Sequence, residues 1–161
     1  EYARLVGDEY IELNARLTRG WLVADAGGVE DGLAEMYAVR DRADELEVIH
    51  LACRASINLP SSLEAMGRSL EAVAAADHGI ELCHTHGLAD PGAWVYSNPA
   101  QSYFSLGLWE QSEAAVACAE RLALAPKTRA LAAVHRAELA VARGEQAEAE
   151  EQLAIALRNF G

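Results

Sequence analysis

Two cysteines and two histidines near the middle of the chain have the residue types of a metal site. His50 lies three residues before Cys53, and Cys83 lies three residues before His86. Residues three apart share one face of a helix, and two thiolates with two imidazoles suit tetrahedral zinc. This spacing matches no known zinc module, however, and free cysteine commonly packs as a small apolar side chain. We therefore expect two packed thiols and no bound metal, with zinc as the alternative.

The remaining residue types give little support for catalysis. No serine, histidine and aspartate, and no cysteine and histidine, stand at a spacing typical of a nucleophile and its base. Glu148, Glu150 and Glu151 lie close together, but an acidic run of this kind is usually a solvated helix face. We expect a protein that is not an enzyme and that needs no cofactor.

The composition predicts a helical protein with no affinity for nucleic acid. Hydrophobic residues make up 52% of the 161 residues and aromatic residues only 6%, so alanine and leucine, both strong helix formers, dominate the apolar content. The formal net charge of −12 and a single lysine, Lys127, argue against binding to a phosphate backbone. No apolar run is long enough to cross a bilayer, and the cysteines have no framework spacing. We expect a soluble protein of the reducing cytoplasm.

A repeated pattern of small residues organises the chain. Gly27, Gly67, Gly107 and Gly144 follow one another at intervals of 40, 40 and 37 residues. Five residues after each glycine stands a small residue, and nine and twelve residues after it stand further small or apolar residues. These offsets fall on one stripe of a helix, so each glycine indicates the turn of a helix hairpin whose second helix buries that stripe. A fixed period of this size is typical of a helical-repeat solenoid.

The pattern predicts one continuous all-α domain over residues 1–161, a solenoid of about four helix hairpins. We expect the hairpins over residues 8–46, 47–86, 90–124 and 126–160, each with its turn at one of the four glycines. Residues 1–7 resemble the last turns of an earlier helix, and the chain begins with glutamate, so we expect a fragment of a larger protein.

Prolines modify this pattern in two places. Pro60 lies inside a predicted first helix, where it removes a backbone donor, and it predicts a kink or a break near Leu59. Asp90 followed by Pro91 predicts the N-cap and first helical position of the third hairpin.

Two stretches carry a family resemblance. One is Asn98-Pro-Ala-Gln-Ser-Tyr-Phe-Ser-Leu-Gly-Leu-Trp-Glu-Gln-Ser-Glu-Ala, and the other is Arg136-Ala-Glu-Leu-Ala-Val-Ala-Arg-Gly. The hairpins resemble tetratricopeptide repeats, lengthened from the usual ~34 residues. More narrowly, the two stretches are similar to the helical region of large ATP-binding LuxR-type bacterial transcriptional regulators. The chain has neither a phosphate-binding loop nor a basic DNA-reading helix, so the resemblance implies the sensing and scaffolding portion, a right-handed superhelix.

The tetratricopeptide resemblance also implies where a partner binds. In such repeats the first helices of successive hairpins build a concave groove. There asparagine offers donor and acceptor to an extended peptide, and large aromatic side chains serve as anchors. Alternatively, the asparagines satisfy backbone groups freed by Pro60 and Pro99, and the aromatic side chains fill the core. The candidate groove residues are Asn14, Trp21, Arg54, Asn58, Trp94, Asn98, Gln101, Phe104 and His135.

We therefore expect a non-catalytic module of a bacterial regulatory protein that binds a protein or peptide segment in this groove, without contact to nucleic acid or membrane. One alternative is a sensor pocket for a small-molecule effector, closed by Trp21, Trp94 and Phe104. Another is a structural scaffold or a surface for homo-oligomers, which predicts an exposed apolar patch at an end of the array, as at residues 157–160.

Overall fold

The computed structural model describes residues 7–160, and every regular element in that range is an α-helix. The all-α prediction is confirmed, and the helix ends lie close to the predicted ones. The suggested earlier helix falls on residues 1–7, of which 1–6 lie outside the described range. None of the described helices is both long and apolar enough to cross a membrane. The helices are α2 (Glu9–Asp25), α3 (Val29–Glu45), α4 (Ile49–Ala65), α5 (Ser69–His86), α6 (Ala89–Ser105), α7 (Trp109–Leu122), α8 (Pro126–Arg143) and α9 (Gln146–Phe160).

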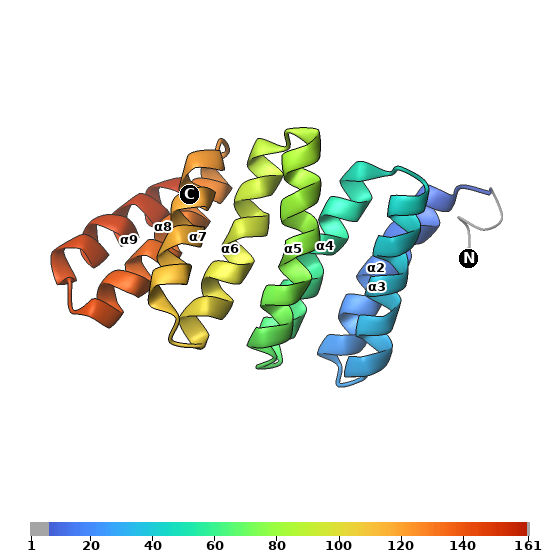
Figure 1. Ribbon diagram of the computed structural model, residues 1–161, viewed down its shortest axis with the longest axis horizontal. Helices are drawn as coiled ribbons and strands as arrows, with labels where there is room; N and C mark the ends of the chain where they lie inside the picture. The colour runs from blue at the N-terminus through green and yellow to red at the C-terminus, as the bar shows by residue number, and fades with distance from the viewer. Residues whose placement is uncertain (1–6, 161) are drawn as a thin grey trace.

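The helices follow one another along the long axis of the molecule, and each packs against the next (Figure 1). The first helices of the hairpins, α2, α4, α6 and α8, also contact one another in order. Over residues 7–160, the backbones of the second helices α3, α5, α7 and α9 do not approach one another as closely, although His78 of α5 reaches Asp44 of α3 with its side chain over 2.7 Å. The structure thus has a closed layer of first helices and a more open layer of second helices.

Small residues allow the two helices of a hairpin to approach closely. Gly32 on α3 faces Gly20 on α2 so tightly that a Cβ atom at Gly32 would lie 2.5 Å from the carbonyl oxygen of Gly20. Between α6 and α7, the Ser112 hydroxyl donates a hydrogen bond to the Ala100 carbonyl over 2.8 Å. The predicted small residues at this crossing are all buried, namely Gly32, Ala72, Ser112 and Ala149.

Positions nine and twelve residues after the turn glycines fill the core, as the sequence predicts. The buried members are Met36, Val39, Ala76, Gly79, Val116, Ala119 and Ala156. Leu153 differs, since 47% of its surface is exposed. It lies on α9, which among the described helices packs only against α8.

The turns share one backbone device. From Gly7 to Gly107, a residue with positive φ recurs every 20 residues, and Glu47 and Gly87 occupy this position between hairpins. The residue after it donates its N–H to the carbonyl five positions earlier, as from Arg68 to Leu63 over 2.9 Å. This Schellman arrangement ends one helix and sets the start of the next. The glycine pattern in the sequence revealed only the turns within hairpins.

Of the kink or break predicted near Leu59, the break is wrong and the kink stays a prediction. Helix α4 continues from Ile49 to Ala65 with Pro60 inside it. The proline ring is fully buried, so packing on the neighbouring helices holds the helix together although one backbone donor is lost.

The predicted role of Asp90 as the N-cap of its own helix is also wrong, because α6 already begins at Ala89. Its Oδ1 atom instead accepts hydrogen bonds at the start of α8, from the N–H groups of Leu124 (2.9 Å) and Ala125 (2.8 Å) and from the Thr128 hydroxyl (2.6 Å). Burial raises the pKa of Asp90, but these hydrogen bonds outweigh it and hold the pKa below its ordinary value.

Replacing Glu47 by glycine should stabilise the protein. Glu47 is the one non-glycine residue with positive φ in the described range, at 54°. A side chain in the left-handed region costs roughly 1 kcal/mol, and the greater freedom of glycine in the unfolded chain offsets part of the gain. We expect Glu47→Gly to raise the free energy of unfolding by about 0.5 kcal/mol, measured by urea unfolding.

The matched control is Gly67→Ala, at a turn glycine with φ of 72° and no neighbouring atom within 4 Å of the added Cβ. It should lower the free energy of unfolding by about 1 kcal/mol through backbone strain alone. A Glu47→Gly protein less stable than the parent would contradict the role assigned to this turn.

Replacing Asp90 by alanine should destabilise the protein in a pH-dependent way. The folded-state pKa lies below the unfolded value of about 3.9, so the ionised carboxylate stabilises the fold above about pH 4 and loses that effect as the pH falls through the folded pKa. We expect Asp90→Ala to lower the free energy of unfolding by about 1–3 kcal/mol at neutral pH and by less at about pH 3. Urea unfolding at both pH values measures this. Asp77→Ala, at an exposed carboxylate, is the control, and an equal loss at both pH values would contradict the prediction.

Candidate functional site

The layer of first helices carries the candidate groove residues, and polar contacts connect its helices. Arg54 on α4 donates from its guanidinium to Asn14 Oδ1 over 2.8 Å and to Thr18 Oγ1 over 3.1 Å, both on α2. Asn14 in turn donates its side-chain amide to the Tyr10 carbonyl over 3.0 Å. The structure therefore brings Asn14 and Arg54 together, and they bind each other across the α2–α4 contact.

Asn98 makes the corresponding contact between α4 and α6. Its Nδ2 atom donates to the carbonyl of Ile57 over 2.7 Å. Pro60 removes the donor to the Ser56 carbonyl, four residues before it, and the Ile57 carbonyl is the next one along α4. Asn98 thus uses its amide to connect α6 to the backbone of α4, although the carbonyl it binds is not the one that Pro60 frees.

Asn58 and Gln101 differ from Asn98, because neither side-chain amide has a hydrogen-bond partner among the described residues. Asn58 occupies in its hairpin the position that Asn98 occupies in the next one. The helix beside Asn58 is α2, which has Gly20 at the position of Pro60 in α4 and so retains its backbone donors. Gln101 lies one turn after Asn98. The two half-buried amides flank the contact between Asn98 and Ile57 on the same layer, and both remain free to bind.

The three predicted aromatic side chains are spread over the layer. Trp21 on α2 is 46% exposed, and Trp94 near the start of α6 is 36% exposed. Phe104 lies ten residues beyond Trp94, about 15 Å along the helix, and packs against a buried cluster that contains Val116 and Leu139. Trp94 instead lines a cavity of about 450 Å³ with Phe160 of α9. The structure does not bring the three rings together.

The His135 side chain contacts a residue of its own helix, α8. Its Nδ1 atom lies 2.9 Å from Glu138 Oε2, one turn further along α8, and its side chain is only 12% exposed. It contributes a local ion pair to the layer when the imidazole is protonated.

The four residues considered as zinc ligands separate into two groups. The sulfur atoms of Cys53 and Cys83 lie 3.8 Å apart and are buried, whereas His50 and His86 are exposed. In the part of the chain that the structure describes, no three histidine, cysteine or acidic side chains gather as a metal site would require.

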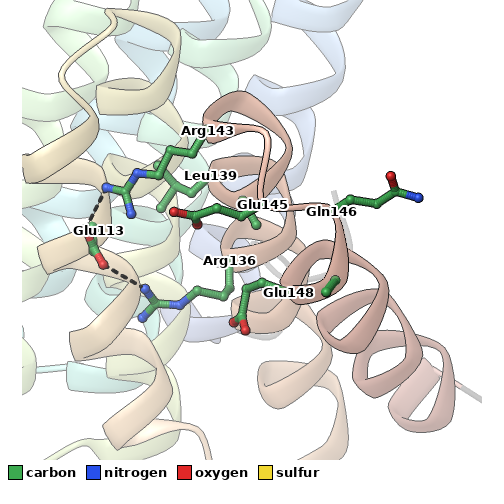
Figure 2. A pocket seen from close by; sticks show the side chains of 9 residues that line it. Glu113, Arg136, Leu139, Arg143, Glu145, Gln146 and Glu148 are labelled. Carbon is green, nitrogen blue, oxygen red and sulfur yellow. Dashed lines mark hydrogen bonds and ion pairs between the residues drawn. The ribbon is translucent and has the colours of Figure 1, made fainter.

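A charged cavity of about 620 Å³ that the sequence did not predict is lined by residues of α7, α8 and α9 (Figure 2). Arg136 and Arg143, both on α8, point to Glu113 of α7, with N to O distances of 3.3 and 2.6 Å. The hydrogen bond from Arg143 lowers the pKa of Glu113. Arg136 also pairs with Glu120 over 2.7 Å. The two arginines stand seven residues apart, which places them two turns apart on one face of α8. This interval is the sequence feature that could have indicated the charged cavity.

A second cavity, of about 280 Å³, lies in the open layer. Helices α5 and α7 form its walls, with Ile80 and Cys118 among the lining residues, and Tyr96, Pro99 and Tyr103 of α6 contribute from between them. It exists because α5 and α7 do not touch. Its lining is mostly apolar, which suits a small organic molecule better than a charged one.

The two asparagines of the closed layer should respond differently to removal. Asn98→Ala takes away a hydrogen bond to the Ile57 carbonyl and should lower the free energy of unfolding by about 1–2 kcal/mol. Asn58→Ala removes no hydrogen bond to a described residue and should change it by less than about 0.5 kcal/mol. Urea unfolding of both variants measures the difference, and equal effects would contradict the roles assigned here.

Comparisons with known proteins gave no match, either to a protein-family model or to a curated protein. The hairpin packing of the helices is compatible with a tetratricopeptide-like region. The resemblance to LuxR-type regulators gains no support from these comparisons.

Proposed function

We propose that this chain is a non-catalytic interaction module that binds an extended protein segment along the layer formed by α2, α4, α6 and α8. The observation that carries the proposal is the pair of amides, Asn58 and Gln101, which lie half-buried on that layer without a hydrogen-bond partner among residues 7–160. A side-chain amide offers one donor group and one acceptor, the pair that a peptide backbone presents. Because no described residue occupies these amides, a bound segment can form hydrogen bonds with both of them.

Two exposed tryptophans lie on helices of the same layer. Trp21 lies on α2 and Trp94 on α6, and tryptophan is enriched among residues that dominate binding energy. The net charge of −12 favours a partner with basic residues, because long-range attraction speeds their encounter. It disfavours a nucleic acid partner.

We also propose the handedness and the repeat type of the helical array. We take the layer of first helices as the concave face of a right-handed, tetratricopeptide-like superhelix of about four hairpins, part of a cytoplasmic bacterial regulatory protein of the LuxR type. The contact of the first helices with one another, together with the wider spacing of the second helices, supports a curved array.

Two other functions each have one supporting observation. A small-molecule sensor is favoured by the apolar cavity between α5 and α7, which contains two tyrosines. An oligomerisation scaffold is favoured by Leu153, Leu157 and Phe160, which form an exposed apolar stripe on α9.

Selection of binding peptides tests the leading proposal. A displayed library of random linear peptides is selected on the immobilised protein, and the affinity of the recovered peptides is measured by fluorescence anisotropy. We expect Asn58→Ala combined with Gln101→Ala to weaken binding by about tenfold or more, which corresponds to 1.4 kcal/mol. Gln111→Ala removes an exposed amide from α7 in the other layer and should leave the affinity unchanged.

Equal affinity of the double variant and the parent, or a selection that recovers no binder, would overturn the proposal. Native mass spectrometry of the same preparation distinguishes the other two functions. An organic adduct would support the sensor, and a dimer would support the scaffold.

A further inference from the structure

Cys53 and Cys83 form a pair of thiols that the proposed function does not use. Cys53 lies on α4 and Cys83 on α5, and their sulfur atoms are 3.8 Å apart. Both residues are 3% exposed and pack in an apolar cluster with Val95 of α6. A disulfide requires a sulfur separation of about 2.05 Å, so each sulfur would have to move by about 0.9 Å. Rotation of the two side chains can provide a movement of this size.

A cavity lies beside the pair on the Cys83 side. Cys83 lines a cavity of about 230 Å³ between the end of α5, the start of α6 and Leu122 of α7. His84 lies in the same lining. This space is large enough for a peroxide molecule. The hydrogen bond between the two thiols lowers the pKa of Cys53 and raises the pKa of Cys83, so Cys53 is the thiol that ionises first.

We propose that Cys53 and Cys83 are a redox-active dithiol that hydroperoxides convert to an intramolecular disulfide. One thiolate attacks the peroxide, the O–O bond breaks, and a sulfenic acid forms as the first water or alcohol leaves. The second thiolate then attacks that sulfur, an S–S bond forms, and the displaced hydroxide takes up a proton to give water. Two thiols thereby lose two electrons and two protons, and the peroxide is reduced by two electrons.

The disulfide would join the two helices of one hairpin and close a loop of 30 residues. Cross-links of this kind stabilise a fold chiefly by restricting the unfolded chain. Cys53 also precedes Arg54, which connects α4 to α2. Oxidation would therefore stiffen the helix that carries several groove residues, but the proposal does not depend on the groove binding a partner.

The third cysteine provides the control. Cys118 lies on α7, is half-buried and accepts a hydrogen bond from Arg121 over 3.0 Å. In the Cys118→Ser protein, the only disulfide that can form within one molecule joins Cys53 to Cys83. The test thus leaves the buried pair unchanged.

The purified Cys118→Ser protein is reduced, freed of reductant and treated with hydrogen peroxide. We expect the intact mass to fall by about 2 Da, the loss of two hydrogens, and the melting temperature to rise by roughly 5–10 °C. Both changes should reverse with reductant, and peptide mapping should recover Cys53 and Cys83 in one linked species.

Three outcomes would overturn the proposal. One is a mass gain of about 16 or 32 Da without the loss of 2 Da, which indicates sulfenic or sulfinic acid. The second is a disulfide-linked dimer. The third is an unchanged mass under conditions that oxidise Cys118 in the parent protein. In a Cys53→Ser/Cys118→Ser variant that retains its helical circular dichroism, the loss of 2 Da should disappear.

Discussion

The close approach of two helices within each hairpin is the constraint on which the rest of the structure depends. At Gly20 and Gly32 the backbones of two helices are in direct contact. At the corresponding crossing of α6 and α7, the small Ser112 side chain donates a hydrogen bond to the Ala100 carbonyl. A larger side chain at such a crossing would separate the helices and displace the core positions on the same face. The left-handed turn residue is equally necessary, because it fixes where the second helix starts and therefore which face meets the first.

The same geometry decides which polar side chains are available to a partner. Contact between first helices uses Arg54 and Asn98 to connect α2, α4 and α6. Asn58 has the register of Asn98 but faces a helix without a proline, and its amide is left free. One residue type at one repeat position thus has a packing role in one hairpin and a candidate binding role in another.

The sequence predicted the features that depend on local spacing. The all-α class, the helix ends and the buried small residues all follow from the glycine period and the helical stripe. Contacts between distant residues were not predictable in this way. Asp90 binds the start of α8, more than thirty residues away, and Arg136 meets Glu113 across two helices. The 20-residue period of the turns was not recognised because Glu47 stands where glycine is usual. The break expected at Pro60 does not occur because the proline ring is packed between helices.

The order of packing also has a consequence for how the molecule gains and loses structure. Within residues 7–160, each helix packs only against the helices next to it and those of the adjacent hairpin. Most contacts are therefore local in sequence, a property associated with rapid folding and with nucleation at more than one place. The interfaces among α6, α7, α8 and α9 do not involve α2 or α3. Opening of the first hairpin would leave them intact, so this protein can unfold in steps from one end, at a free-energy cost below that of global unfolding.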